Sequence, residues 1–124
     1  MFARAANIYR SVDLESAPKT QVVERLFDRF DRDLVSARAA ITARDIVAKA
    51  SAIDHAVRIV IELRGALDFA AAPELCNHLD ALYAFVLGQL GEANAKLSCA
   101  PLDHAAKVMT TLGDAFRRAH ELAR

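Results

Sequence analysis

The chain has 124 residues, the size of one domain with a modest core. Its 16 basic side chains equal its 16 acidic ones, so the overall charge favours neither nucleic acid nor an anionic membrane as a partner. Hydrophobic residues make up 54% of the chain, but charges interrupt every apolar run before the roughly 20 residues that span a bilayer. Nothing at the N-terminus has the pattern of a signal peptide, so we expect a cytoplasmic protein whose two cysteines are reduced thiols.

Apolar residues recur at three- and four-residue steps in four stretches, the period of an amphipathic helix. The first stretch begins near Pro18 and continues to about Ile41. The second follows Asp45, whose carboxylate is suited to an N-cap, and continues to about Leu67. The sequence therefore predicts two long helices joined by a short connection around residues 42–45.

Proline and serine mark the start of two further helices. Pro73 fits the first turn of a helix that extends to about Ala95, and Ser98 and Pro101 precede one that extends to about Ala119. Short connections make consecutive helices antiparallel neighbours. The sequence thus predicts an all-α protein: an antiparallel up-down four-helix bundle over residues 16–124, with residues 1–15 outside it as an N-terminal arm.

The predicted second and third helices have wider apolar faces than a bundle helix needs, which is an arc of somewhat over 100°. In the third helix Phe85 and Leu87 lie about 100° to either side of the inward stripe, and in the second Ile59 and Leu63 widen one flank. Thicker packing, or cover by the arm, is one explanation. The other is a groove that accepts a further amphipathic helix. The expected inward stripe of the third helix consists of Leu75, Leu79, Leu82, Val86 and Leu90.

Cys76, His78 and Asp80 lie close together in the sequence, as metal ligands can. However, residues two apart point about 200° apart on a helix, so Cys76 and His78 cannot hold one ion. Cys76 and Asp80 share a face but need further ligands, for which Cys99 and His104 would have to approach from across the bundle. The chain also has no glycine-rich phosphate loop, nucleophile elbow or Glu-x-x-His element. We therefore predict no catalytic residue, no cofactor and no metal.

The sequence IELRGALDF…PELCNHLDALYAFVLGQLGEAN, residues 61–94, resembles the FliS family of flagellar export chaperones. In that family an Asn-Leu-x-x-Leu-Tyr-x-aromatic run leads to Leu-x-x-Ala-Asn. Looser matches lie elsewhere in the chain, at Tyr9, ESAP, LFDRF and AFRRA, in the same order as in the family. The resemblance therefore covers almost the whole chain. The matching positions are Asn77, Leu79, Leu82, Tyr83, Phe85, Leu90, Ala93 and Asn94, and the departures are His78, Arg29 and Phe116.

The resemblance implies a cytoplasmic chaperone, and not an enzyme, that binds the disordered C-terminal region of flagellin. Such a chaperone prevents premature polymerisation and delivers its client to the flagellar type III export apparatus. It also implies that the client folds along apolar surfaces of the bundle and that the N-terminal arm covers part of them when no client is bound. With the wide helix faces, this predicts a client groove at Ile59, Leu63, Tyr83, Phe85 and Leu87, and an arm that covers it through Ile8, Tyr9 and Val12.

Two other classes of protein fit the same pattern. A homodimeric interaction protein would use the apolar excess to close its own interface. A metal-binding bundle would require ligands to converge from different helices.

Overall fold

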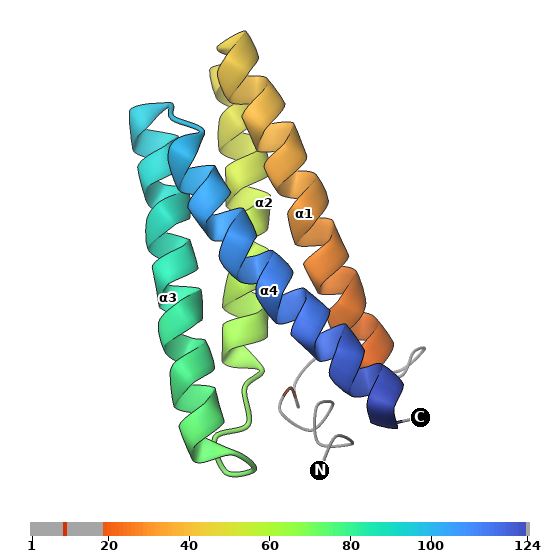
Figure 1. Ribbon diagram of the computed structural model, residues 1–124. Coiled ribbons are helices and arrows are strands. Elements are labelled where there is room, and N and C mark those ends of the chain that lie inside the picture. Colours follow the sequence, from red (N-terminus) through yellow and green to blue (C-terminus); the bar gives the residue numbers. More distant parts are fainter. Residues whose placement is uncertain (1–8, 10–18, 124) are drawn as a thin grey trace.

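The computed structural model describes Tyr9 and residues 19–123. Residues 19–123 form four α-helices that run alternately up and down (Figure 1). The predicted all-α bundle is therefore confirmed. The rest of the predicted arm, including Ile8 and Val12, and the expected helix start at Pro18 lie outside the described residues. The helices are α1 (Lys19–Ala43), α2 (Ile46–Gly65), α3 (Pro73–Lys96) and α4 (Ala100–Ala123).

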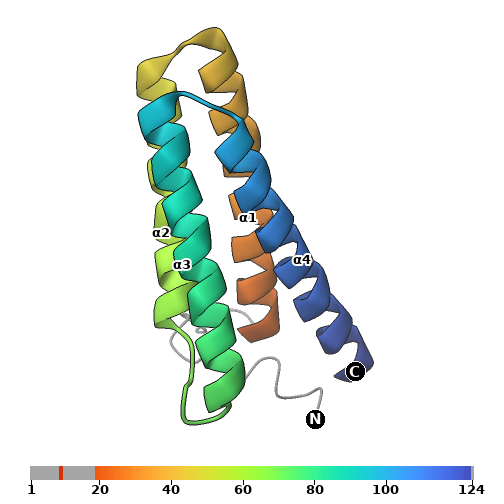
Figure 2. The ribbon, with the colours of Figure 1, turned by 60° about the vertical axis from the view of Figure 1, so that its left-hand side comes forward.

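Consecutive helices pack against each other, and α4 also packs against α1. Figure 2 shows α2 and α3 side by side, with α1 and α4 behind and beside them. In both ribbon views α3 and α4 are close at their connection and separate toward the other end of the bundle. Within the described residues, no helix is both long and apolar enough to cross a membrane.

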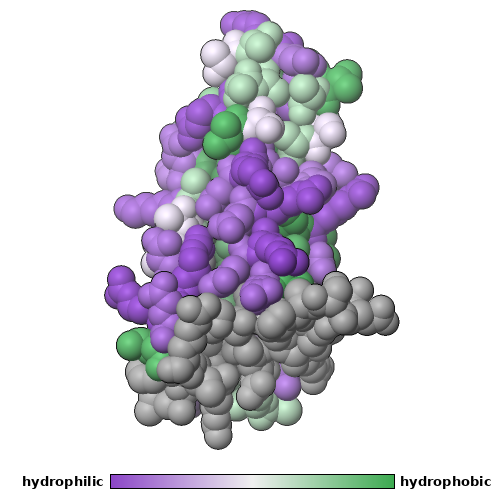
Figure 3. Space-filling model, turned by 90° about the vertical axis from the view of Figure 1, so that its right-hand side faces the viewer, coloured by the Kyte–Doolittle hydropathy of each residue, from purple (hydrophilic) through white to green (hydrophobic). Residues whose placement is uncertain are grey.

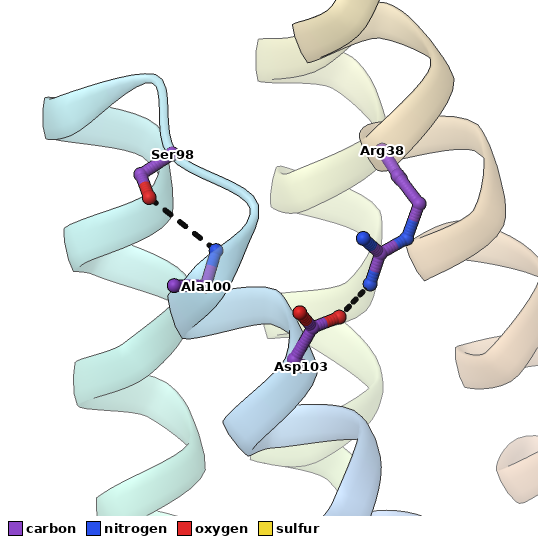
Figure 4. A network of polar contacts seen from close by, with 4 residues as sticks. All are labelled: Arg38, Ser98, Ala100 and Asp103. Carbon is purple, nitrogen blue, oxygen red and sulfur yellow. Dashed lines mark hydrogen bonds and ion pairs between the residues drawn. The ribbon is translucent and has the colours of Figure 1, made fainter.

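The helix starts follow the expected capping chemistry. The Asp45 carboxylate accepts a hydrogen bond from the backbone N–H of Ala48 at 3.0 Å, and Pro73 lies in the first turn of α3. Before α4, the Ser98 hydroxyl accepts from the N–H of Ala100 at 3.3 Å (Figure 4). These local bonds satisfy backbone donors that a helix N-terminus leaves free.

The core consists of the apolar sides of all four helices, with Phe30, Leu63, Leu90 and Met109 among its fully buried side chains. One charged side chain, Lys49, is also buried among the described residues. Its Nζ donates to the carbonyl oxygen of Asn94 at 2.9 Å. The carbonyls of the last helical turn carry partial negative charge, so this contact satisfies the cation and ties α2 to the end of α3.

Ion pairs link the helices at the surface. The Arg64 guanidinium donates to the Asp80 carboxylate at 2.6 Å between α2 and α3, and Arg38 on α1 pairs with Asp103 on α4 (Figure 4). Figure 3 shows the side that lies at the right in Figure 1: above the grey segments it is mostly hydrophilic, with small separate hydrophobic spots.

The expected inward stripe of α3 is wrong at two positions. Leu75 is 46% exposed and Leu82 is 38% exposed, whereas Cys76, Tyr83 and Ala93 are buried. At 100° per residue, the buried direction of α3 is rotated by about 30° from the expected one. The physical reason is Tyr83: it can point inward because its hydroxyl finds a polar partner in the interior, the hydroxyl of Tyr9.

Candidate partner-binding groove

Two apolar pockets lie along the junction of α3 and α4 and share Leu112, and together we call them the α3–α4 groove. The first pocket has a volume of about 230 Å³ and lies between the first turns of α3 and the second half of α4. The second has a volume of about 250 Å³ and lies nearer the connection between α3 and α4. The first is lined by Tyr9, Leu75, Leu79, Leu112, Ala115, Phe116 and Ala119, and the second by Leu82, Lys107, Val108, Thr111 and Leu112.

The groove exists because α3 and α4 diverge and because α4 has small side chains there. Ala115 and Ala119 line the pocket at the open end, where the two helices lie furthest apart. Among the described residues that line the groove, Lys107 is the single charged one. A concave apolar surface between two helices is suited to the apolar face of a further helix.

Tyr9 is inserted at the open end of the groove. It is 3% exposed, and its ring meets that of Phe116 edge to face with centroids 5.8 Å apart. Its backbone forms an isolated antiparallel bridge with Leu67, just after α2. Its hydroxyl lies 2.6 Å from the hydroxyl of Tyr83, and the two are hydrogen-bonded. One residue from the predicted arm therefore reaches the core and forms part of the pocket wall.

Burial raises the pKa values of several side chains in this region. It raises the pKa of Tyr9 to about 12, and the hydrogen bond to Tyr83 acts in the opposite direction. Burial also raises the pKa of Tyr83, and the neighbouring Tyr9 raises it further. Both hydroxyls are therefore protonated at neutral pH. Burial likewise raises the pKa of the Cys76 thiol, which donates to the carbonyl of Asp68 at 3.3 Å, so this cysteine is a poor nucleophile.

The five residues predicted to line a client groove do not share one surface. Leu63 and Tyr83 are fully buried, and Ile59 is buried and lines a more polar pocket between α1 and α2. Leu87 is partly buried against the core, about 200° around α3 from Phe85. Phe85 is 46% exposed. Contact between these residues and a client remains a prediction, and Phe85 is the one among them with a large exposed side chain.

The groove residues on α4, Val108 and Leu112, belong to the regular apolar period of the predicted fourth helix, so the sequence does not distinguish them from core positions. The periodicity also assigned Leu75 and Leu82 to the core. The signal that could have pointed to them is the pairing of large residues on one edge of α3 with alanines on the facing edge of α4. That pairing depends on which helix edges meet, which periodicity alone does not give.

Among the described residues, no group of three or more histidine, cysteine, aspartate or glutamate side chains could hold a metal ion. Cys76 and Cys99 are both free. The described part of the chain is thus a helical bundle with an apolar groove between α3 and α4, which places it in the class of helical bundles whose surface is suited to the apolar face of a helix from another chain.

A family model described as "Flagellar protein FliS" matches residues 1–123. The chain therefore belongs to the FliS family of flagellar proteins, as the resemblance predicted. FliS proteins are chaperones, so the family also establishes that this chain is not an enzyme.

Individual relatives agree with the family. The chain is 27% identical over 121 residues to the flagellar secretion chaperone FliS of Salmonella typhimurium, covering 94% of this chain and 90% of the relative. It is 28% identical over 108 residues to the flagellar secretion chaperone FliS of Vibrio cholerae, covering 86% and 79%. It is 29% identical over 110 residues to the flagellar secretion chaperone FliSB of Pseudomonas aeruginosa, covering 86% and 87%.

Proposed function

We propose that this protein is a cytoplasmic chaperone of flagellin that binds the disordered C-terminal region of its client in the α3–α4 groove. By covering that region it prevents premature polymerisation and keeps the client ready for the flagellar type III export apparatus. The observation that carries the proposal is the apolar groove itself, together with the secretion-chaperone names of the relatives.

Binding in such a groove is coupled to folding. A disordered segment loses conformational entropy when it docks as a helix, and burial of apolar surface at about 25 cal/mol per Å² must exceed that loss. Each leucine that becomes fully buried contributes about 1.5–3 kcal/mol before the entropy is subtracted. Leu75 and Leu82 are 46% and 38% exposed, so each would contribute about half of that value or less when a client covers it.

The proposal makes Tyr9 an internal competitor of the client. Its ring takes up space at the open end of the groove and contacts Phe116, which lines the same pocket. A client that extends to this end must displace Tyr9. The arm then protects the apolar pocket when no client is present, as the resemblance to the family implies.

Calorimetric titration with a peptide of the flagellin C-terminal region tests the proposal. We expect one peptide to bind per chain, and Leu82→Asp to weaken binding by about 10- to 100-fold, because it places a charge in the groove. Phe85→Asp, at the neighbouring edge of α3, tests whether the client also covers that side chain. Val35→Asp is the matched control, since Val35 is 70% exposed on α1 and lines neither pocket of the groove.

Three outcomes would contradict the proposal. If the peptide does not bind, or if Leu82→Asp binds as tightly as Val35→Asp while both remain folded, the groove is not the client site. If light scattering gives the molar mass of a stable dimer both with and without the peptide, the homodimeric interaction protein is favoured instead.

A further inference from the structure

We propose that the client residue that replaces Tyr9 has a long side chain ending in a hydroxyl or an amide, which hydrogen-bonds the hydroxyl of Tyr83. Tyr83 thereby becomes a specificity-determining residue at the inner end of the α3–α4 groove. This inference rests on the proposed function, because it concerns the client that displaces Tyr9.

The first step is the environment of the Tyr83 hydroxyl. The Tyr83 side chain is fully buried, and within the part of the chain that the structure describes its hydrogen-bonding partner is Tyr9. The nearby thiol of Cys76 is directed to the carbonyl of Asp68. The Tyr83 hydroxyl is thus satisfied by Tyr9, which also lines the α3–α4 groove.

The second step is what happens when Tyr9 leaves. The space of its ring joins the pocket and opens it toward the Tyr83 hydroxyl. The other side chains that line this pocket are all apolar, and they include Leu75, Leu79 and Phe116. Apart from the backbone of Leu67, which the departure of Tyr9 also frees, the lining offers a water molecule few of the two to four polar partners it needs, so water substitutes poorly for Tyr9. A client that offers only methyl groups leaves the hydroxyl buried and unsatisfied.

The third step is the size of the effect and the kind of side chain. A buried hydroxyl without a partner weakens a complex by about 5- to 100-fold relative to one whose hydroxyl is bonded. Because the Tyr9 hydroxyl lies at the far end of an aromatic ring, a replacement must be comparably long. Tyrosine and glutamine have this reach, whereas serine does not. The site therefore selects by a hydrogen bond at one position within an otherwise apolar contact.

The test is a scan of the flagellin C-terminal peptide against three forms of the full chain. Each tyrosine of the peptide is replaced in turn by phenylalanine and each glutamine by methionine, and affinity is measured by calorimetry. The chains are wild type, Tyr83→Phe and Thr111→Val. Thr111→Val is the control, since it removes a hydroxyl from the same groove that already donates to the carbonyl of Lys107 within α4 at 2.9 Å.

We expect one peptide position whose replacement weakens binding to wild type and to Thr111→Val by at least about 5-fold, but changes binding to Tyr83→Phe by less than about 2-fold. If the peptide binds and no position distinguishes Tyr83→Phe from wild type, the inference is overturned while the proposed function stands. If Tyr83→Phe does not fold, the scan on wild type decides the question. The inference is then overturned if every replacement in the peptide changes the affinity by less than about 2-fold. If wild type binds no peptide at all, the proposed function fails and this inference with it.

Discussion

At the scale of single residues, the pair of tyrosine hydroxyls links the one described residue of the arm to the core. Removing one hydroxyl of a buried pair leaves the other without a partner, whereas removing both leaves neither. Tyr9→Phe should therefore lower the free energy of unfolding by about 1–2 kcal/mol. The double variant Tyr9→Phe/Tyr83→Phe should lose less than the sum of the two single variants. Urea denaturation measures all four corners of this cycle, and additive losses would contradict the buried bond.

Asp31 illustrates a carboxylate whose charge opposes folding. Burial raises its pKa; the Arg117 guanidinium lowers it, and the carboxylates of Asp28 and Asp114 raise it. The folded state thus holds the proton more tightly than the unfolded state, whose pKa is about 3.9. This contribution to stability falls as pH rises from about 3.9 through the folded pKa. We expect Asp31→Asn to melt at the same or a higher temperature than wild type at pH 7, and the gain to vanish in acid.

Asp80 provides the matched case of opposite sign. Its hydrogen bonds from the Arg64 guanidinium, at 2.6 and 3.2 Å, hold the pKa of Asp80 below its usual value. The stabilisation is present above the unfolded pKa and is lost as pH falls through the folded pKa. Asp80→Asn should therefore lower the melting temperature at pH 7, where Asp31→Asn does not. Equal shifts in the same direction for both variants would show that these assignments of the electrostatics are wrong.

At the scale of the helices, capping contributes to stability in a way that the sequence already predicts. Asp45→Ala removes the acceptor of the Ala48 N–H at the start of α2 and should cost about 1 kcal/mol. Asp54→Ala is the control: its partner Arg58 is one turn away on an exposed face at 3.0 Å, and its loss should cost under about 0.5 kcal/mol. Chemical denaturation compares the two. If Asp54→Ala lowers the free energy of unfolding as much as Asp45→Ala does, the N-cap hydrogen bond makes no contribution of its own to stability.

Periodicity and capping residues predicted the four helices and their connections closely, because these signals are local. The second helix began after Asp45 as expected, and α3 began at Pro73. What they could not give is the rotation of α3 about its axis. That rotation buries Tyr83, whose hydroxyl meets that of a residue 74 positions earlier in the sequence, a contact with no local signal.

The candidate groove was predicted even less completely than the fold. The excess of apolar surface on α3 was visible in the sequence, and Phe85 is indeed exposed. However, the position of the pockets follows from the divergence of α3 and α4, which is a property of the packed bundle. Ile59 and Leu63 on α2 are buried, whereas the apolar pockets lie between α3 and α4.

At the scale of the whole molecule, the bundle provides a stable frame and the groove provides an apolar surface that one residue of the arm partly occupies. Tyr9 contacts α4 through Phe116, the α2–α3 connection through Leu67 and α3 through Tyr83. Its release would therefore change three parts of the molecule at once, all at the open end of the groove. The central claim is that the client and Tyr9 occupy this place alternately.

The most direct test is ¹⁹F NMR of the full chain labelled with fluorotyrosine during titration with the flagellin C-terminal peptide. The chain has two tyrosines, so two resonances are expected, and Tyr9→Phe assigns them. The account predicts that saturating peptide moves the Tyr9 resonance to the position of a solvent-exposed fluorotyrosine, while the Tyr83 resonance keeps the shift of a buried one. A Tyr9 resonance that stays at its buried position when the peptide is fully bound would contradict the account.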